Sequence, residues 1–285
     1  MTLRQAYEEG IERLKEAGIE EAGLDAWYLL EYVTGINRAT YFADSNQEMK
    51  DSHRATYQAL ISERETRIPL QHLTGVQEFM GLEFRVNEHV LIPRQDTEIL
   101  VETALEKINT KKPLRVLDMC TGSGCILLSV LSYGRKKCEI TGVGVDVSDK
   151  ALQVAKENAR NLQVDAEWIE SDLFSGVSEK FDMILSNPPY IPSAVIKTLQ
   201  PEVREHDPLL ALDGKEDGLY FYRKIIEESR NYLQPGGWLI FEIGAEQGEA
   251  VSSYLKQNGF VQVAVKKDLA GLDRVVCGVY DTCEG

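Results

Sequence analysis

The sequence has few of the side chains from which metal centres and disulfide frameworks are built. It contains only four histidines, at positions 53, 72, 89 and 206, and their spacing matches no metal-ligand motif, so we expect no metal site. Its five cysteines, at positions 120, 125, 138, 277 and 283, are odd in number and form no Cys-x-x-Cys pair. A reduced, intracellular chain is the simpler interpretation of this pattern.

Long apolar runs are missing as well. No stretch approaches the roughly eighteen consecutive apolar residues that a membrane-spanning helix needs. The first residues, Met1 to Gln5, open an amphipathic helix rather than a signal peptide. We therefore expect a cytoplasmic protein without a membrane partner.

Positive charge is in short supply, because Asp and Glu total 46 against 31 Lys and Arg, a net charge of −15. Such a field repels phosphate backbones at long range, so we expect no direct nucleic-acid partner. The same field suits a protein partner with a basic surface.

Two regions differ in hydrophobic periodicity, and 285 residues leave room for about two domains. Residues 1–73 have a helical period that predicts a small helical bundle, with its aromatic residues expected in a core rather than on a binding surface. Its apolar stripes comprise Leu3, Tyr7, Ile11 and Leu14, then Leu24, Trp27, Tyr28 and Tyr32, then Tyr57, Leu60, Ile61 and Arg64.

The remainder of the chain has the pattern of an α/β protein. Residues 74–92 alternate polar and apolar side chains and predict a two-stranded hairpin that links the two parts. Asp96 is expected to cap the helix that follows. From there to residue 285, strands alternate with helices, which predicts a doubly wound, mostly parallel sheet with a ligand crevice at its carboxyl edge. The runs 260–265 and 274–280 have no helix between them and predict an antiparallel hairpin at the sheet edge.

The most informative segment is Asn187-Pro188-Pro189-Tyr190, which follows the apolar run 181–186 and so lies at the carboxyl end of a predicted strand. Prolines lack an N–H group, so this loop presents carbonyl acceptors to a ligand, and the Asn187 side chain adds another oxygen. Two acceptors that hold the N–H bonds of an amide or aryl amine would direct its nitrogen lone pair along a fixed line. Tyr190 offers a flat face for stacking. A rigid turn that closes a strand is the alternative interpretation of this segment taken alone.

A glycine-rich turn lies upstream, between a predicted strand at 114–119 and a helical run from 126. The turn consists of Cys120, Thr121, Gly122, Ser123, Gly124 and Cys125. This order is typical of a nucleotide-binding βαβ unit, in which glycines let the backbone approach a ligand and the helix N-terminus favours negative charge. The turn has neither the Gly-Lys-Ser/Thr of a P-loop nor a complete GxGxxG pattern.

Acidic residues end the neighbouring predicted strands. Asp146 could accept hydrogen bonds from both ribose hydroxyls, and Asp172 could accept one from an adenine amino group while Leu173 or Phe174 packs on the ring. Taken singly, each aspartate could equally be a turn or cap residue. Three acidic strand ends, at 118, 146 and 172, followed by Asn187, fit S-adenosylmethionine better than NAD. The candidate cofactor-binding residues are therefore Cys120, Thr121, Gly122, Ser123, Gly124, Asp146, Asp172, Leu173 and Asn187.

Around these motifs the chain resembles the HemK/PrmC family, methyltransferases that modify the glutamine of the Gly-Gly-Gln motif in class I peptide chain release factors. The segment from Leu91 to Glu98 is similar to the family's LIPRPDTE, with Gln95 in place of a proline, and Cys120 stands where many relatives have glycine. Further matches in family order include His206-Asp207-Pro208, Pro235-Gly236-Gly237, Glu242-Ile243-Gly244 and Asp273-Arg274.

The resemblance implies methyl transfer from S-adenosylmethionine to the N5 amide nitrogen of that glutamine, which modulates translation termination. The candidate catalytic residues are Asn187, Pro188 and Tyr190, and the candidate substrate-binding residues are Asn187, Pro188, Pro189 and Tyr190. Residues 1–73 would dock the release factor, 74–92 would link the domains, and 93–285 would form the catalytic domain.

Two other classes of function use parts of the same pattern. An adenine-N6 methyltransferase acting on DNA or RNA would use the same four-residue motif, although the charge of −15 argues against a basic nucleic-acid groove. A non-catalytic S-adenosylmethionine-binding scaffold would keep the glycine-rich turn and Asp146, but would have little reason to retain the motif at 187–190.

Overall fold

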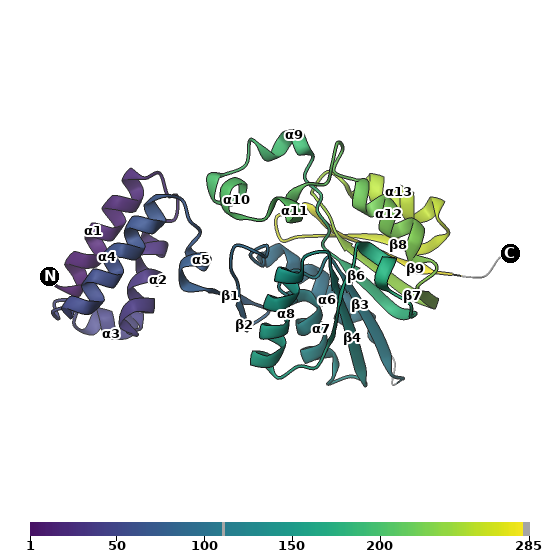
Figure 1. The fold of residues 1–285 in the computed structure, drawn as a ribbon, viewed down its shortest axis with the longest axis horizontal. Helices are drawn as coiled ribbons and strands as arrows, with labels where there is room; N and C mark the ends of the chain where they lie inside the picture. The colour runs from purple at the N-terminus through teal and green to yellow at the C-terminus, as the bar shows by residue number, and fades with distance from the viewer. Residues whose placement is uncertain (110–111, 282–285) are drawn as a thin grey trace. The chain divides into compact units, whose positions relative to one another are not determined.

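The computed structural model describes residues 1–109 and 112–281, and the chain forms two compact units (Figure 1). The helical unit comprises Met1–Val76 together with Gln200–His206, and the sheet unit comprises Gln77–Leu199 together with Asp207–Gly285. The predicted fold class is confirmed: a small helical bundle precedes an α/β part with a mostly parallel sheet. Within the described residues, no helix has the length and apolar character that crossing a membrane requires.

The helical unit contains helices from two segments of the chain, 1–76 and 200–206, and the first segment supplies its apolar core. They are α1 (Leu3–Glu16), α2 (Ala22–Thr34), α3 (Arg38–Ala43), α4 (Asp51–Glu65), α5 (Leu70–Thr74) and α10 (Pro201–His206). Helix α1 begins at a capping box, in which Gln5 N donates to Thr2 Oγ1 at 3.2 Å and Thr2 N donates to Gln5 Oε1 at 2.9 Å. Helices α1 and α4 approach closely at Gly10, where a Cβ atom would lie 2.2 Å from the Tyr57 hydroxyl.

The second apolar stripe of this unit is only partly in the core, which corrects the prediction. Trp27 is buried, but Leu24, Tyr28 and Tyr32 are 38%, 43% and 55% exposed. Helix α2 carries apolar residues on nearly every side, so periodicity alone does not identify the face that packs against α1 and α4. Trp27, Ala26 and Leu30 take that position, and the other face keeps its aromatic rings in solvent.

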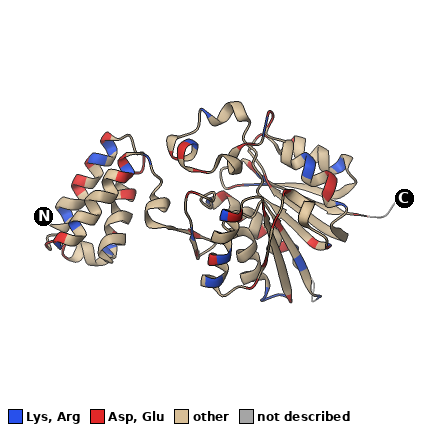
Figure 2. Cartoon of the chain, in the orientation of Figure 1, with Lys and Arg blue, Asp and Glu red and all other residues tan. Residues whose placement is uncertain are grey.

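A buried cation joins distant segments of the helical unit. The Arg64 guanidinium of α4 donates to Asp25 of α2 at 2.8 Å and to Glu202 of α10 at 3.0 Å. Arg67 donates to the other oxygen of Glu202 at 2.7 Å. Burial alone would raise the pKa of Glu202, but the hydrogen bonds from the two arginines outweigh it and lower that pKa. On the outer surface, acidic and basic side chains are interspersed along α1 and α4 (Figure 2).

The sheet unit contains a seven-stranded sheet of order β5-β4-β3-β6-β7-β9-β8. The strands are β3 (Leu114–Met119), β4 (Ile140–Asp146), β5 (Glu167–Glu170), β6 (Phe181–Ser186), β7 (Leu233–Glu242), β8 (Phe260–Lys267) and β9 (Asp273–Tyr280). The pairs from β5 through β7 are parallel, whereas β9 runs antiparallel to β7 and β8. The predicted C-terminal hairpin is therefore confirmed, with β8 at the edge.

Helices cover both faces of this sheet, as the continuous apolar strands require. The helices of the unit are α6 (Glu98–Lys107), α7 (Cys125–Gly134), α8 (Asp149–Leu162), α9 (Ser193–Ile196), α11 (Leu209–Leu212), α12 (Tyr220–Ser229) and α13 (Gly248–Gln257). Successive strand residues alternate between two cores. Val116 packs in the core formed with α6 and α7, and Leu117 packs in the core formed with α12 and α13.

The hairpin predicted between 74 and 92 forms a separate two-stranded sheet of β1 (Val76–Phe79) and β2 (Leu82–Arg85). Phe79 and Phe84 are buried in the core with α6 and α7. The buried Asn158 amide of α8 holds β2 through hydrogen bonds with both Arg85 N, at 2.6 Å, and Arg85 O, at 3.0 Å.

Asp96 does not cap α6, contrary to the prediction. It lies within the 3₁₀ turn Gln95–Thr97, and Thr97 stands at the start of the helix without a side-chain capping bond. The Asp96 carboxylate instead pairs with Arg274 of β9 at 3.1 Å. A long-range ion pair has thus taken the place of the local hydrogen bond that the sequence suggested.

Candidate functional site

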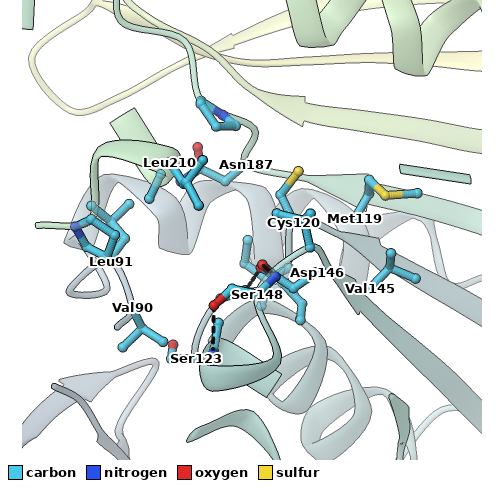
Figure 3. A pocket seen from close by; sticks show the side chains of 18 of the residues that line it. Val90, Leu91, Met119, Cys120, Ser123, Val145, Asp146, Ser148, Asn187 and Leu210 are labelled. Carbon is cyan, nitrogen blue, oxygen red and sulfur yellow. Dashed lines mark hydrogen bonds between the residues drawn. The ribbon is translucent and has the colours of Figure 1, made fainter. Parts of the chain in front are cut away.

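A cavity of about 280 Å³ opens at the carboxyl ends of the parallel strands in the sheet unit. The turns after β3, β4, β5 and β6 contribute most of its polar lining, because carboxyl ends of parallel strands meet at one edge of a sheet. Figure 3 shows Met119, Cys120 and Val145 on the sheet side, with Val90 and Leu91 across from them. The cavity lies where the sequence predicts a ligand crevice.

Asp146, at the end of β4, is held by backbone donors. Gly122 N donates to its Oδ2 and Ser148 N donates to its Oδ1, each at 2.9 Å. Burial raises the pKa of this carboxyl group, and the hydrogen bonds from Ser148 and Gly122 oppose that rise. Each carboxylate oxygen has a further lone pair. Asp146 is therefore oriented toward the cavity as an acceptor for a pair of hydroxyl groups.

The glycine-rich turn leaves open space beside its first glycine, which is compatible with the predicted approach of a ligand. Gly122 has φ of +55° and no atom within 4 Å of where its Cβ would be, so its side of the cavity is open. Cys120 also has a positive φ, of 61°, although a non-glycine residue is strained there. Ser123 lines the cavity, and its buried Oγ meets no hydrogen-bond partner of ordinary geometry within the described residues. A polar ligand atom would satisfy that hydroxyl.

The other predicted cofactor residues divide into two groups. Cys120, Thr121, Asp172, Leu173 and Asn187 all line the cavity. Gly124 does not; it begins α7 with φ of +79°, and a Cβ there would meet Trp168 at 3.0 Å, so its role is close packing. Phe174 stacks on Tyr232 at 4.6 Å between ring centroids, which leaves Leu173 as the apolar residue at this end of the cavity.

Beneath the turn lies a buried acid. Asp118 is fully buried at the end of β3, and Thr121 Oγ1 donates to its Oδ2 at 2.6 Å. Burial raises the pKa of Asp118 to about 7, against the effect of the Thr121 hydrogen bond. Its Oδ1 meets no hydrogen-bond partner of ordinary geometry in the described part of the chain.

The segment 187–190 follows β6 directly, as predicted, but its four residues do not share one environment. Asn187 and Pro189 line the cavity, whereas Pro188 is buried and Tyr190 packs against the core with α12 and α13. The Tyr190 hydroxyl donates to Glu242 at 3.4 Å, and its carbonyl accepts from Gln247 at 3.0 Å. The ring of Tyr190 is therefore a support of the loop here, and not part of the cavity wall.

Sequence reasoning missed the wall formed by two distant segments. Val90 and Leu91 come from the segment before α6, and Leu210 comes from α11, where its side chain is 69% exposed. Arg94 and Asp207 join these segments through an ion pair at 2.8 Å. Both segments carry family-like motifs, so the signal was present, but nothing in the sequence indicated that they meet.

The remaining candidates for chemistry are metal ligands and cysteine thiols. No group of three or more histidines, cysteines or acids in residues 1–109 and 112–281 is arranged to hold a metal ion. Cys120, Cys125 and Cys277 are present as thiols, and burial raises the pKa of each above its usual range. Cys283 lies outside the described residues.

Comparison with known proteins places this architecture in a family. Residues 5–75 match the PrmC N-terminal domain, and residues 95–201 match the methyltransferase small domain. A release factor glutamine methyltransferase of Caulobacter vibrioides is 40% identical over 100% of this chain and 98% of that protein. One from Clostridium botulinum is 41% identical over 97% of this chain and 98% of that protein.

A solved structure agrees at the level of the fold. The 16S rRNA methyltransferase of T. thermophilus, in complex with AdoMet and guanosine, aligns with a TM-score of 0.50 and 15% identity, covering 72% of this chain and 49% of that one. The sequence identity near 40%, over the full length of the release factor glutamine methyltransferases, is much more specific than this structural similarity. This chain belongs to the release factor glutamine methyltransferase family.

Proposed function

We propose that this protein transfers a methyl group from S-adenosylmethionine to the N5 amide nitrogen of the glutamine in the Gly-Gly-Gln motif of class I peptide chain release factors. The observation that carries the proposal is the position of Asn187 and Pro189 in the lining of the same cavity as Asp146. Asn187 can accept a hydrogen bond from a substrate amide, and Asp146 can accept hydrogen bonds from a ribose. Both face one cavity, as transfer from an adenosine cofactor to a planar amide requires.

The cavity fits S-adenosylmethionine by the chemistry of its donors and acceptors. Asp146 offers carboxylate oxygens to the ribose hydroxyls, Leu173 offers an apolar surface to the adenine, and Asp172 an acceptor to its amino group. The Ser123 hydroxyl, which lines the cavity, can serve the amino acid end. When bound, the cofactor supplies an electrophilic methyl group on a sulfonium centre.

The residues of the chain supply orientation and charge stabilisation. An amide nitrogen is a poor nucleophile because its lone pair is delocalised into the carbonyl group. The Asn187 side-chain oxygen and a backbone carbonyl of the 187–190 loop would accept the two N–H bonds and direct the nitrogen at the methyl carbon, an effect worth up to roughly 7–11 kcal/mol in favourable cases. The same acceptors stabilise positive charge that develops on nitrogen, more strongly where water is excluded.

The helical unit is proposed to dock the body of the release factor, because a single glutamine offers too few contacts to be selected. Its exposed stripe of Leu24, Tyr28 and Tyr32 on α2 has the aromatic character of protein interfaces. Replacing Tyr28 and Tyr32 together with Ser should raise the KM for an intact release factor about tenfold or more. The rate with a short Gly-Gly-Gln peptide should stay unchanged, and an equal effect on both substrates would contradict docking.

The activity is tested directly with labelled S-adenosylmethionine. Purified enzyme is incubated with a release factor, with the same factor in which the Gly-Gly-Gln glutamine is replaced by Ala, and with DNA or RNA. The proposal is supported if label enters only the release factor that retains the Gly-Gly-Gln glutamine. Label in adenine would instead support the adenine-N6 alternative, which the net charge of −15 disfavours.

A further inference from the structure

A buried hydroxyl contacts the side chain proposed to hold the substrate. Asn187 Nδ2 donates to Thr97 Oγ1 at 3.5 Å, across 90 positions of sequence. Thr97 is only 2% exposed, at the end of the 3₁₀ turn that precedes α6, and it lines the same cavity. The hydroxyl is thus a partner that water cannot readily replace.

Thr97 also interacts with the buried carboxyl group of Glu242, at the end of β7. This residue is 2% exposed, and its Oε1 accepts from the Tyr190 hydroxyl at 3.4 Å. The Thr97 side chain acts on the Glu242 carboxyl group and lowers its pKa, while no partner of ordinary hydrogen-bond geometry reaches Oε2 within the described residues. Burial raises the pKa of Glu242 to about 7, and Thr97 and the Arg274 charge oppose that rise.

Groups from several elements face this carboxyl group. Arg274 of β9 attracts it, but Arg274 also pairs with Asp96 and Asp268, at 3.1 and 3.0 Å. Asp96 raises the pKa of Glu242 by its own charge. The hydroxyl of Tyr222 on α12 donates to the Glu242 carbonyl at 2.9 Å, and the charge of Glu242 acts on the Cys125 thiol of α7, which lies in the core on the other face of the sheet. In the part of the chain that the structure describes, Glu242 therefore makes no ion pair, and it shares the Arg274 charge with two other acids.

We propose that Thr97 and Glu242 are positioning residues that determine which end of the Asn187 amide faces the substrate. The proposal rests on the function proposed above for Asn187. An ionised carboxylate only accepts hydrogen bonds, and a threonine hydroxyl has one proton to donate. When that proton is directed at Glu242, the Thr97 lone pairs are left for Asn187. The Asn187 NH2 then turns toward Thr97, and its Oδ1 turns into the cavity to accept from the substrate amide.

Protonation of Glu242 removes this constraint. A neutral carboxyl group can donate to Thr97, which frees the Thr97 proton for Asn187 Oδ1. The Asn187 amide can then adopt the opposite orientation and present its NH2 to the substrate NH2, which is a donor facing a donor. Activity should therefore require the ionised form of Glu242 and should fall as the pH drops through about 7.

The first test removes the hydroxyl without changing shape. Thr97→Val should lower kcat about tenfold or more, as expected for loss of an orienting hydrogen bond, with the KM for S-adenosylmethionine within about twofold. Thr97→Ser should restore most of the lost kcat. The matched control is Thr103→Val, because Thr103 is equally buried on α6 but donates to Ile99 O at 2.6 Å, in its own helix. This control should keep the wild-type kcat.

The second test separates positioning from packing by pH. Wild-type kcat should rise with pH through about 7, whereas Glu242→Gln should be low and nearly independent of pH in that range. Asp118 also has its pKa raised to about 7, so the difference between the two profiles, and not the wild-type profile alone, identifies Glu242.

Three outcomes would overturn the proposal. The first is a kcat of Thr97→Val equal to that of Thr103→Val. The second is an equal loss of kcat in Thr97→Val and Thr97→Ser. The third is a kcat of Glu242→Gln that still falls at low pH as in the wild type. If the wild type itself transferred no methyl group to a release factor, the proposed function would fail and the positioning role with it. An active wild type with unaffected variants would overturn the positioning role alone.

Discussion

Buried charge is compensated differently in the core of the helical unit and at two strand ends of the sheet unit. In the helical unit, Arg64 and Asp25 are 6% and 7% exposed, and they pair with each other while Glu202 takes a second donor of the guanidinium. In the sheet unit, Asp118 and Glu242 are at most 2% exposed, and neither makes an ion pair within the described residues. The pKa of each rises to about 7 as a result.

This difference separates stability from function. A buried ion pair with good hydrogen bonds is destabilising to break but does no chemistry. A buried carboxyl group without a cation is held at a cost in stability, and such perturbed groups gather at functional sites. The comparison therefore predicts that changes to buried polar groups weaken folding in the helical unit and weaken activity in the sheet unit.

The largest effect on folding is expected at Arg64. Arg64→Met would leave the buried Asp25 carboxylate without its cation and Glu202 with Arg67 alone, and it should destabilise the helical unit by about 3–5 kcal/mol. The loss should appear as faster hydrogen exchange of the amides in α2 and α4, with unchanged S-adenosylmethionine affinity. Arg54→Met is the matched control, because Arg54 pairs with Asp51 on the surface at 3.2 Å and such pairs contribute about 0–1 kcal/mol. Similar hydrogen exchange in the two variants would show that the buried pair contributes no more to folding than the surface pair.

Replacement of Asn187 should lower activity with little effect on folding. Asn187→Ala should lower kcat by about 10²–10³, as for the loss of one oriented group at a reacting centre. Thermal unfolding should change little, since Asn187 is only partly buried and the hydrogen bond that its side chain donates to Thr97 is long, at 3.5 Å. Its S-adenosylmethionine affinity should stay within a few-fold of the wild type. Parallel loss of cofactor affinity and turnover would refute the assigned role.

Asp146 tests the cofactor side of the cavity. Asp146→Ala should weaken S-adenosylmethionine binding by about 1–3 kcal/mol, through loss of charge-assisted hydrogen bonds to the ribose. Isothermal calorimetry measures this directly, with Asp149→Ala as a control because Asp149 is exposed in the first turn of α8. Equal affinities in the two variants would remove Asp146 from the site.

The last prediction concerns the pH dependence of stability at Glu242, which has an unusual sign for an acidic residue. The pKa of Glu242 is raised from 4.5 to about 7 by folding, so its contribution to stability is present below about pH 4.5 and is lost as the pH rises to about 7. Glu242→Gln cannot ionise and should be more stable than the wild type above pH 7, by about 1–3 kcal/mol, yet less active.

Chemical denaturation at pH 5 and pH 8 measures that difference. The wild type and Glu242→Gln should be nearly equal in stability at pH 5 and should diverge at pH 8. Glu227→Gln is the control, because Glu227 is exposed on α12 and should leave both values unchanged. A variant that is less stable than the wild type at pH 8 would show that the carboxylate is well solvated or paired.

Much of the sheet unit could be predicted from the sequence. The runs 114–119 and 181–186 are strands with the predicted bounds, because continuous apolar runs between turn residues have few alternative structures. The position of Asn187 and Asp146 at strand ends followed from the same pattern. Their common cavity follows in turn from parallel strand order, which the alternation of strands and helices indicates.

The helical unit was harder to predict in detail. Its helical character is confirmed, but the stripe of Leu24, Tyr28 and Tyr32 is on the surface, since a helix with apolar residues on most sides does not specify its buried face. The return of Gln200–His206 to this unit had no sequence signal, because Glu202 and Arg64 are 138 positions apart. The docking role of residues 1–73, and the domain limits proposed with it, stay predictions.

The sequence by itself determined the local structures and the residue types at their ends, because propensity, periodicity and turn chemistry act over a few neighbouring residues. Only the tertiary structure decided which polar groups are buried and which partners they meet. Thr97 comes from a 3₁₀ turn, Asn187 from the loop after β6 and Glu242 from the end of β7, and Tyr190 packs against the core and donates to Glu242. Burial and long-range contact arise only when the elements pack, and they determine the acidity and orientation of those groups.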